Sequence, residues 1–509
     1  MTFGVVQKLL GFARDILIAG RFGAGGATDA LMVAQNLPLM ITGSLSTALG
    51  VGIVPVVTKL RVEGQKEDAR LVVSTILNGT LFVSTAVALA GVLLAGPLIR
   101  LSAPGLTTES MAIAAGLARV FFVAYIFLAL TSVIGLLLNS LKEFSIPALS
   151  PLILNVFTIA LIVWLAGGLG IYAVAYGFAA GAVVQYVMQD FWLCRKGMRP
   201  GTVFNLRHPA VKRVLVLALP ILAAALVADL YGVIDNWFAS HLAEGSITAK
   251  TYGLKVIQMP VGILTVGVST VFYPTLSERA AHRDEAGLAD TVAFGLRMVA
   301  LITIPAAVGL AVLRVPIVRA LFQHGAWDET AALRTSAVVL YYAIGIFAAT
   351  AWPIFLRAFQ GMQDMITPLW MGTFNAGVNI ILDWVFIRRF ALIGLPLANS
   401  VTAFLSIALY YVLLSRRVRG GLQGGRLAVS LVKITAASAV MGGVVWSGLG
   451  LAARLAPSAG RAVQAAELAV LILLGALVYL IGLIALRLEE VRSFGALLSR
   501  VARRAAGTR

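Results

Sequence analysis

The chain has 509 residues, of which 60% are hydrophobic and 12% charged, and its mean hydropathy is +0.94. Soluble domains carry about 25% charged residues, so this composition excludes a soluble globular protein and favours one polytopic membrane domain. The net charge of +18 does not indicate nucleic-acid binding, because the basic residues stand in short connectors between apolar runs, and the single Cys194 excludes an internal disulfide or a Cys-based metal cluster.

The first predicted span, centred near residue 13, carries charges inside an apolar stretch. Lys8 and Asp15 share one helix face, and Arg14 with Arg21 forms a second. Charges are costly in hydrocarbon, so this helix must border a hydrated cavity. Salt bridges of Lys8 with Asp15, or of Arg14 with Asp29, would still leave an excess of cations. No cleavable signal peptide is expected, because the segment has no small-residue cleavage site and leads directly into further spans.

Thirteen further apolar runs follow, so we expect about fourteen transmembrane helices. Their centres lie near residues 44, 84, 126, 155, 180, 226, 263, 302, 344, 376, 404, 439 and 474. An even number of spans places both termini on one side. The connectors 58–70, 194–213 and 415–426 and the tail are rich in Lys and Arg, which by the positive-inside rule predicts that both termini are cytoplasmic.

Two pairs of spans repeat along the chain. Pro38 and Pro260 align at an offset of 222 residues, and Pro147 and Pro368 at an offset of 221. The agreement predicts a parallel duplication with the substrate site at the lobe interface near the membrane midplane. The alternative is that these prolines only kink packed helices.

The predicted fold is therefore an all-α integral membrane protein with two pseudo-symmetric six-helix lobes and two additional helices. The N-lobe covers 1–195, the C-lobe 212–417 and the additional pair 427–487. The tail 488–509 is basic. It is expected either to lie as a helix on the anionic inner leaflet or to be a solvated tail that only sets the topology.

Cations from both lobes are expected to meet in one chamber. Lys255 stands five residues before Pro260, so it would join Lys8 and Arg14 at the lobe interface. Lys and Arg in a membrane cavity suit an anionic substrate, most commonly a phosphate or pyrophosphate. Asp29 would form a helix cap or an outer-gate ion pair.

A second polar cluster suits a cation. Four-residue spacing places Asn375, Asn379 and Asp383 on one helix face, and further polar residues come from neighbouring spans: Asp229, Asp235, Asn399 and Ser400. We predict an ion-coupling site at Asp235, Asn379, Asp383 and Asn399. Na⁺ is one candidate ion, a proton on the same carboxylates is another, and a structural hydrogen-bond network is the alternative to both.

No enzymatic signature is found. The chain has no Walker-type loop and no Gly-x-Ser-x-Gly nucleophile elbow, and its four histidines are scattered over predicted connectors. We therefore expect a transporter without a cofactor, driven by an ion gradient, by the membrane potential or by consumption of its product.

Several motifs in chain order resemble the MurJ/MviN lipid II flippases, a family of the multidrug/oligosaccharidyl-lipid/polysaccharide exporter superfamily. LGFARD followed by a TDA segment is the specific feature of the resemblance. The motifs are LGFARD (10–15), FGAGGATDA (22–30), LP (37–38), SAPGL (102–106), FSIPALSPLILN (144–155), LFQHGAWD (321–328) and QDMITP (363–368).

The resemblance implies a monomeric flippase of the bacterial cytoplasmic membrane. It would move undecaprenyl-pyrophosphate-linked disaccharide-pentapeptide (lipid II) to the outer leaflet for peptidoglycan synthesis. Its partners would be lipid II, membrane lipids and the cell-wall synthesis machinery. The family's substrate-binding residues carry over to Lys8, Arg14, Asp29, Lys255 and Gln258, and the last two helices would border a groove for the polyprenyl tail.

The sequence departs from the family pattern at four points. Lys8 and Lys255 stand where the family has Arg, Thr42 where it has an Arg on the second helix, and Gln258 where it has an acid. The chain also starts about ten residues late. These departures keep open a flippase for another polyprenyl-pyrophosphate glycan. A cation-coupled multidrug exporter is the third hypothesis, against which a cationic chamber would argue.

Overall fold

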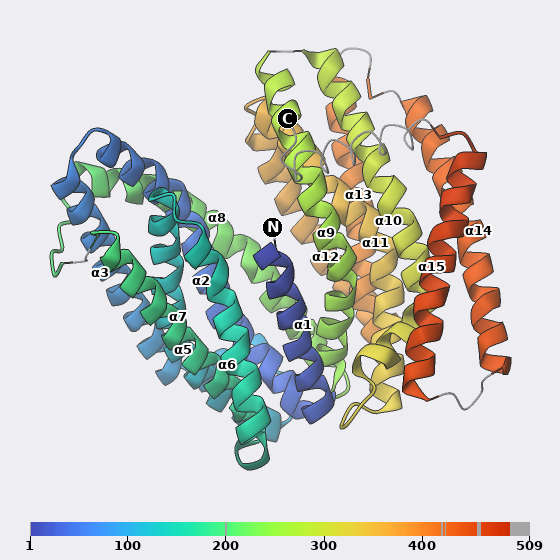
Figure 1. Ribbon diagram of the computed structural model, residues 1–509, viewed down its shortest axis with the longest axis horizontal. Coiled ribbons are helices and arrows are strands. Elements are labelled where there is room, and N and C mark those ends of the chain that lie inside the picture. The colour runs from blue at the N-terminus through green and yellow to red at the C-terminus, as the bar shows by residue number, and fades with distance from the viewer. Residues whose placement is uncertain are drawn as a thin grey trace. The chain divides into compact units, whose positions relative to one another are not determined.

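The computed structural model describes residues 2–198, 201–282, 284–418, 421–422, 424–455 and 460–488. Figure 1 shows these residues as an arrangement of helices. They are α1 (Thr2–Phe22), α2 (Gly26–Val62), α3 (Lys66–Leu93), α4 (Ala95–Ser102), α5 (Thr108–Ser140), α6 (Ser145–Leu169), α7 (Tyr172–Arg195), α8 (Pro209–Ser240), α9 (Ser246–Ala281), α10 (Glu285–Phe322), α11 (Glu329–Gly361), α12 (Ile366–Phe390), the 3₁₀ helix η1 (Ala391–Ile393), α13 (Gly394–Arg417), α14 (Gly424–Leu455) and α15 (Arg461–Ala485).

The predicted all-helical membrane fold is confirmed. Each of the fourteen expected span centres lies inside one long helix, and the short α4 is the one α-helix of the described chain that the hydropathy pattern missed. Ten helical stretches in this part of the chain are long and apolar enough to cross a membrane, and one of them runs through α12, η1 and α13. The predicted basic tail, 488–509, lies outside the described residues except for its first position.

The chain forms two compact units, which differ from the lobes expected from the repeat. Unit 1 comprises residues 1–248 and 324–328, and unit 2 comprises 249–323 and 329–509. The repeat placed the boundary before α8, whereas the structure places α8 in unit 1, where it packs along α2. Gly52 makes this packing close, because a Cβ there would lie 2.8 Å from the carbonyl oxygen of Val214. The duplication itself stays a prediction.

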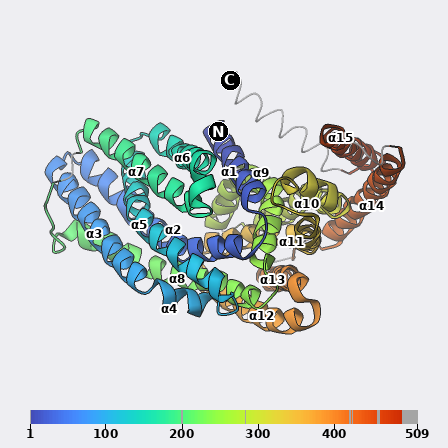
Figure 2. The same ribbon diagram turned by 90° about the horizontal axis from the view of Figure 1, so that it is seen from below.

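Unit 1 is built around α2, which packs against both α5 and α8, while α6 and α7 lie side by side (Figures 1 and 2). Gly177 and Gly181, one turn apart on α7, face the backbone of α6 at Thr158 and Leu154. A Cβ on either glycine would lie 2.9 to 3.0 Å from an α6 Cα atom. Small residues at this spacing let membrane helices approach closely where lipid supplies no hydrophobic drive between them.

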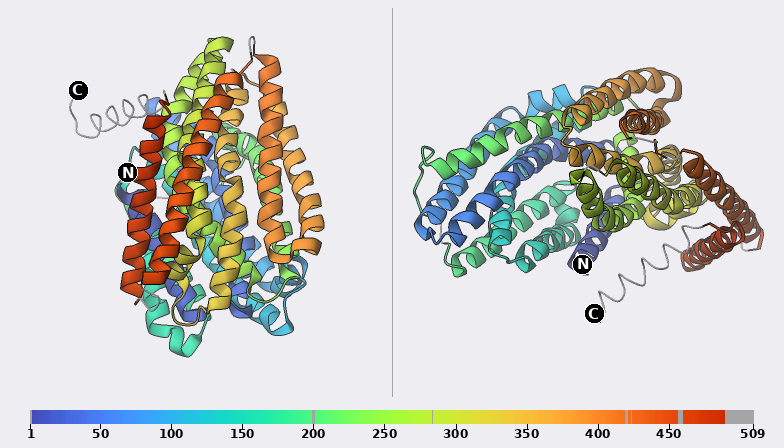
Figure 3. Two further views of the ribbon diagram at one scale, coloured as in Figure 1. Left: turned by 90° about the vertical axis from the view of Figure 1, so that its right-hand side faces the viewer. Right: turned by 90° about the horizontal axis from the view of Figure 1, so that it is seen from above.

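Unit 2 has an aromatic core where α11 meets α13. Phe355 and Phe359 are fully buried against Tyr410, and the rings of Phe355 and Tyr410 stack with their centroids 5.9 Å apart. α14 and α15 run side by side (Figure 3) and contact α10. The Tyr479 hydroxyl of α15 donates to the Leu301 carbonyl oxygen of α10 at 2.6 Å. Their outer surface stays apolar, with Trp446 70% exposed, as expected for helices in contact with lipid.

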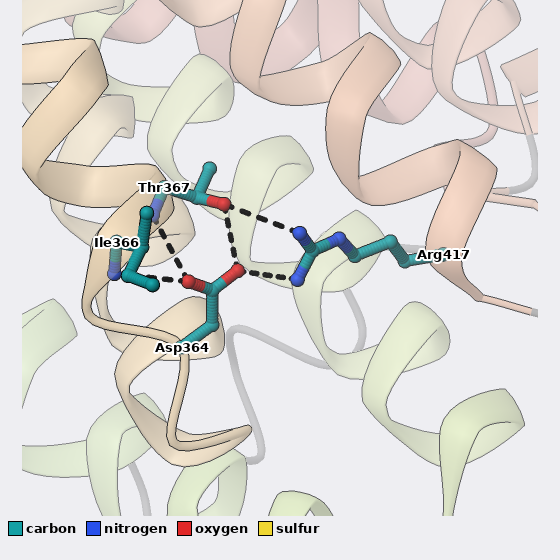
Figure 4. A network of polar contacts seen from close by, with 4 residues as sticks. All are labelled: Asp364, Ile366, Thr367 and Arg417. Carbon is teal, nitrogen blue, oxygen red and sulfur yellow. Dashed lines mark hydrogen bonds and ion pairs between the residues drawn. The ribbon is translucent and has the colours of Figure 1, made fainter.

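A polar network joins the start of α12 to the end of α13 (Figure 4). The Asp364 carboxylate accepts from the Thr367 backbone N–H at 2.9 Å and from the Thr367 hydroxyl at 2.6 Å, and it forms an ion pair with Arg417. Burial raises the pKa of Asp364, but the Thr367 hydrogen bonds and the Arg417 charge outweigh it and hold this pKa below its usual value. Asp364 therefore serves as the cap of α12.

Replacing Arg417 by Ala is expected to lower the melting temperature of the purified protein at pH 7 by roughly 2 °C, the effect of a half-exposed ion pair of about 1 kcal/mol. Because the folded pKa of Asp364 lies below its unfolded value, the contribution is complete above about pH 4 and is lost as the pH falls through the folded pKa. Thermal unfolding of both proteins at pH 7 and at a series of pH values that falls from 4 to below the folded pKa of Asp364 checks this. Arg416→Ala, at the exposed neighbouring position, is the control, and a difference that persists in acid would contradict the prediction.

Candidate functional site

The cations predicted on α1 have different surroundings. Lys8 is exposed, whereas Arg14 forms an ion pair with the adjacent Asp15: Nη2 lies 2.9 Å and Nε 3.2 Å from Asp15 Oδ1. This pairing differs from both salt bridges expected from the sequence. Side chains at consecutive helix positions point away from each other, but the long arginine stem lets the guanidinium reach across. Asp15 is buried, so the ion pair lies on a face of α1 that the rest of the protein covers.

Asp29 caps the start of α9. Its carboxylate is 2% exposed and accepts three hydrogen bonds: from Gly245 N at 2.7 Å, from Thr248 N at 2.7 Å and from Thr248 Oγ1 at 2.6 Å. All three residues belong to unit 1. The sequence had suggested a cap, an outer-gate ion pair or a substrate contact for Asp29. The hydrogen bonds are those of a cap, on α9 instead of on its own helix, and the substrate contact stays a prediction.

Asp29→Ala is expected to lower the melting temperature by about 5 °C, because it leaves the buried N–H groups of Gly245 and Thr248 unsatisfied at a cost of about 3 kcal/mol. Thr248→Val, which removes only the hydroxyl, should have a smaller effect. Glu67→Ala, at an exposed position on α3, is the control. Thermal unfolding of the detergent-solubilised proteins checks the order, and an unchanged Asp29→Ala protein would contradict the cap.

Unit 1 contains a hollow of about 590 Å³ between α2 and α8. Within it, Ser44 Oγ donates to Asp229 Oδ2 at 2.5 Å, and Ser44 is itself buried. Asp229 is the one acidic or basic side chain among the lining residues of the described chain; Lys8 and Arg14 are not among them. The polar part of the lining consists of Asn36, Gly43, Ser44 and Thr47 on α2 and Asp229 and Tyr231 on α8.

Thr42 does not line this hollow. It lies on a different face of α2, at a pocket of about 30 Å³ shared with α3 and α5. Asp229 was among the polar residues expected from the sequence, whereas Ser44 and the polar stripe of α2 were not. The signal was present, because Asn36, Gly43 and Thr47 recur at helical spacing in an apolar run.

The predicted residues of α9 belong to unit 2. Lys255 Nζ lies 4.9 Å from the centre of the fully buried Tyr252 ring, a cation–π contact, and Gln258 is exposed. Since Lys8 and Arg14 belong to unit 1, the chamber that would combine these cations stays a prediction.

The ion-coupling residues are also divided between the units. Asn379 and Asp383 lie one turn apart on α12 in unit 2, and both are fully buried. Asn379 Nδ2 donates to Thr402 Oγ1 on α13 at 3.3 Å. Asn399 lies three positions, or about one helical turn, before Thr402 on the same helix. Asp235 lies on α8 in unit 1. The buried amide, carboxylate and hydroxyl oxygens of α12 and α13 are the donors that a hard monovalent cation prefers.

Fold and site together define a polytopic, all-helical membrane protein with a polar hollow between α2 and α8. The fold is similar to that of an inward-facing multidrug-resistance transporter of the MATE family, which matches with a TM-score of 0.67, 17% identity, and coverage of 81% of this chain and 95% of that one. The solved structure "Lipid II flippase MurJ, inward closed conformation" matches with a TM-score of 0.78 and 25% identity, over 96% of this chain and 98% of that one.

The sequence comparisons identify the family. The profile "Lipid II flippase MurJ" matches residues 18–457. The lipid II flippase MurJ of Burkholderia cenocepacia is 30% identical over 427 residues, 82% of each chain, and the probable lipid II flippase MurJ of Vibrio cholerae is 29% identical over 424 residues, 80% of each chain. The chain therefore belongs to the MurJ family of lipid II flippases, which confirms the resemblance seen in its motifs.

Proposed function

We propose that this protein moves lipid II from the inner to the outer leaflet of the bacterial cytoplasmic membrane. The observation that carries the proposal is the match to the MurJ profile over residues 18–457, which covers α2, α8 and α9 in full and the last turn of α1. A pyrophosphate crossing about 30 Å of hydrocarbon needs a polar lining, which Lys8 and Arg14 on α1 and Lys255 on α9 would supply.

In the proposed cycle the inward-facing carrier binds the head group while the polyprenyl chain stays in lipid along α14 and α15. Arg14 and Lys8 attract the pyrophosphate electrostatically, and Lys255 joins them from α9. Rocking of the lobes then exposes the head group to the outside. The chain's own residues bind, orient and release the lipid, and no covalent step is involved.

The test is complementation of a strain depleted of its lipid II flippase, combined with labelling of lipid II at the outer surface. We expect growth and outward labelling. Absence of both, with the protein present in the membrane at normal levels, would contradict the proposal.

A flippase for another polyprenyl-pyrophosphate glycan is the second candidate. It is favoured by Thr42, which replaces a family arginine and faces a small pocket instead of the hollow. Identification of the lipid that copurifies with the protein separates the two candidates, because they share the pyrophosphate and differ in the glycan.

We further propose that cation binding at Asp235, Asn379, Asp383 and Asn399 resets the carrier. Asp235→Asn is expected to reduce any Na⁺ dependence of transport at least fivefold, since the substitution removes a charge and keeps the shape. Transport measured in liposomes with Na⁺ or with K⁺ checks this, with Asp68→Asn as the control. An unchanged Na⁺ dependence would mean that the four residues form a structural hydrogen-bond network and do not bind the coupling ion.

We propose that both termini are cytoplasmic. The connector between α2 and α3 and the basic residues at the start of α8 would then face the cytoplasm. A cysteine placed at Gly64 in a Cys194→Ser background should react with an impermeant thiol reagent only after the cells are opened. Labelling in intact cells would reverse the assigned orientation.

A further inference from the structure

The hollow between α2 and α8 has the size of a small-ligand site. Its volume of about 590 Å³ lies within the 300 to 1,000 Å³ typical of ligand pockets. Gly43 opens into it: a Cβ at this position would meet no atom within 4 Å. Asn36, Ser44 and Thr47 on the same stripe of α2 make this wall of the hollow polar.

The hollow is lined by one acidic side chain, that of Asp229. Asp229 is partly exposed and lines the space, and Ser44 holds its Oδ2 with a 2.5 Å hydrogen bond. The lining residues of the described chain include no lysine, arginine or histidine. A carboxylate within a membrane helix is costly unless it faces water or a cation. This hollow therefore favours a cationic group, which is the opposite of what the pyrophosphate requires.

The size of the hollow selects between kinds of cation. A bare alkali ion needs about six oxygens at about 2.3 to 2.6 Å. This hollow has room for many waters of about 30 Å³ each, so its walls are too far apart to supply six oxygens at that distance. An organic ammonium group fits better, because the molecule that bears it fills part of the hollow and the group donates three directional hydrogen bonds. The Asp229 carboxylate can accept one of them, and the Asn36 and Thr47 oxygens can accept the others.

We propose that this hollow binds the primary ammonium group of the peptide in the substrate's head group, with Asp229 as its counter-charge. The proposal rests on the proposed function, since lipid II carries a pentapeptide whose diamino acid has a free amine. Asp229 is then a specificity-determining residue: the carrier recognises the pyrophosphate through cations and the peptide through an acid.

The experiment uses the full-length protein in detergent and two probes, lipid II with a lysine-containing peptide and the same lipid II acetylated on the lysine amine. Binding of each is measured by titration with native protein, Asp229→Asn, Gly43→Phe and Asp68→Asn. Asp229→Asn keeps the shape and an acceptor oxygen for Ser44, and Asp68→Asn is the matched control outside the hollow.

We expect native protein and Asp68→Asn to bind the free-amine lipid about tenfold more tightly than the acetylated lipid, as for one charge-assisted hydrogen bond. Asp229→Asn should bind both equally, at the affinity of the acetylated form, and Gly43→Phe should lose the preference by filling the hollow. Equal binding of both lipids by native protein, or a preference that survives in Asp229→Asn, overturns the inference but leaves the flippase intact. Failure of native protein to bind either lipid overturns the proposed function, and the inference with it.

Discussion

Replacing Arg14 by Ala is expected to abolish complementation while the protein level in the membrane is unchanged. A guanidinium that is 20% exposed on α1 can keep its bond to Asp15 Oδ1 and still direct its remaining N–H groups at a phosphate. Loss of one such charged contact should reduce the rate of transport about a hundredfold, the effect of about 3 kcal/mol. Arg14→Lys keeps the charge but loses the planar fork, so it should retain partial activity.

The pairing with Asp15 requires a second variant. If Arg14 serves only to neutralise Asp15, then the double substitution Arg14→Ala with Asp15→Asn should restore growth, because the unbalanced acid is gone. If Arg14 binds the pyrophosphate, the double variant should fail as the single one does. Lipid flipping in liposomes and growth of the depleted strain distinguish these outcomes. Restored transport in the double variant would mean that Arg14 does not bind the substrate.

Gly43→Phe is expected to have an effect of similar size through the hollow between α2 and α8. The new ring meets no protein atom at its Cβ and projects into a space of about 590 Å³, where it displaces the head group. The folded protein should not suffer, because phenylalanine favours a helix over glycine by roughly a few tenths of a kcal/mol. We therefore expect loss of complementation at an unchanged or raised melting temperature.

Gly168→Phe is the matched control, since Gly168 is also a helical glycine of unit 1 with open space at its Cβ, but it lies at the exposed end of α6. It should grow normally. Normal growth of Gly43→Phe would mean that the substrate does not enter this hollow, and a fall in the melting temperature of Gly43→Phe would mean that the ring disturbs the packing of α2 and would contradict the prediction.

Hydropathy determined the helices because a span is a local property. About eighteen to twenty apolar residues cross the bilayer whatever their neighbours are, so each span centre could be placed without tertiary information. The shared face of Asn379 and Asp383 followed in the same way from the helical repeat of 3.6 residues, and both are fully buried. Motifs such as LGFARD indicated the family for a related reason: a short run of residues can be read from the sequence without knowing the tertiary structure.

Helix packing and long-range contacts required the tertiary structure. The carboxylate of Asp29 accepts hydrogen bonds from Gly245 and Thr248, which follow it by 216 and 219 positions in the chain. No periodicity in the sequence indicates so long a separation. The same holds for Ser44 and Asp229, which are 185 positions apart and meet because Gly52 lets α8 pack against α2. The repeat suggested a boundary before α8, but helices associate by the complementarity of their surfaces, and that complementarity joined α8 to unit 1.

The sequence by itself determined that this is a polytopic helical membrane protein, where its spans lie and which family its motifs resemble. The tertiary structure alone decided which polar groups neutralise one another and which line a hollow. The physical reason is that burial in the bilayer depends on each segment's own composition, whereas hydrogen bonds and ion pairs depend on atoms a few ångströms apart that distant parts of the chain must bring together.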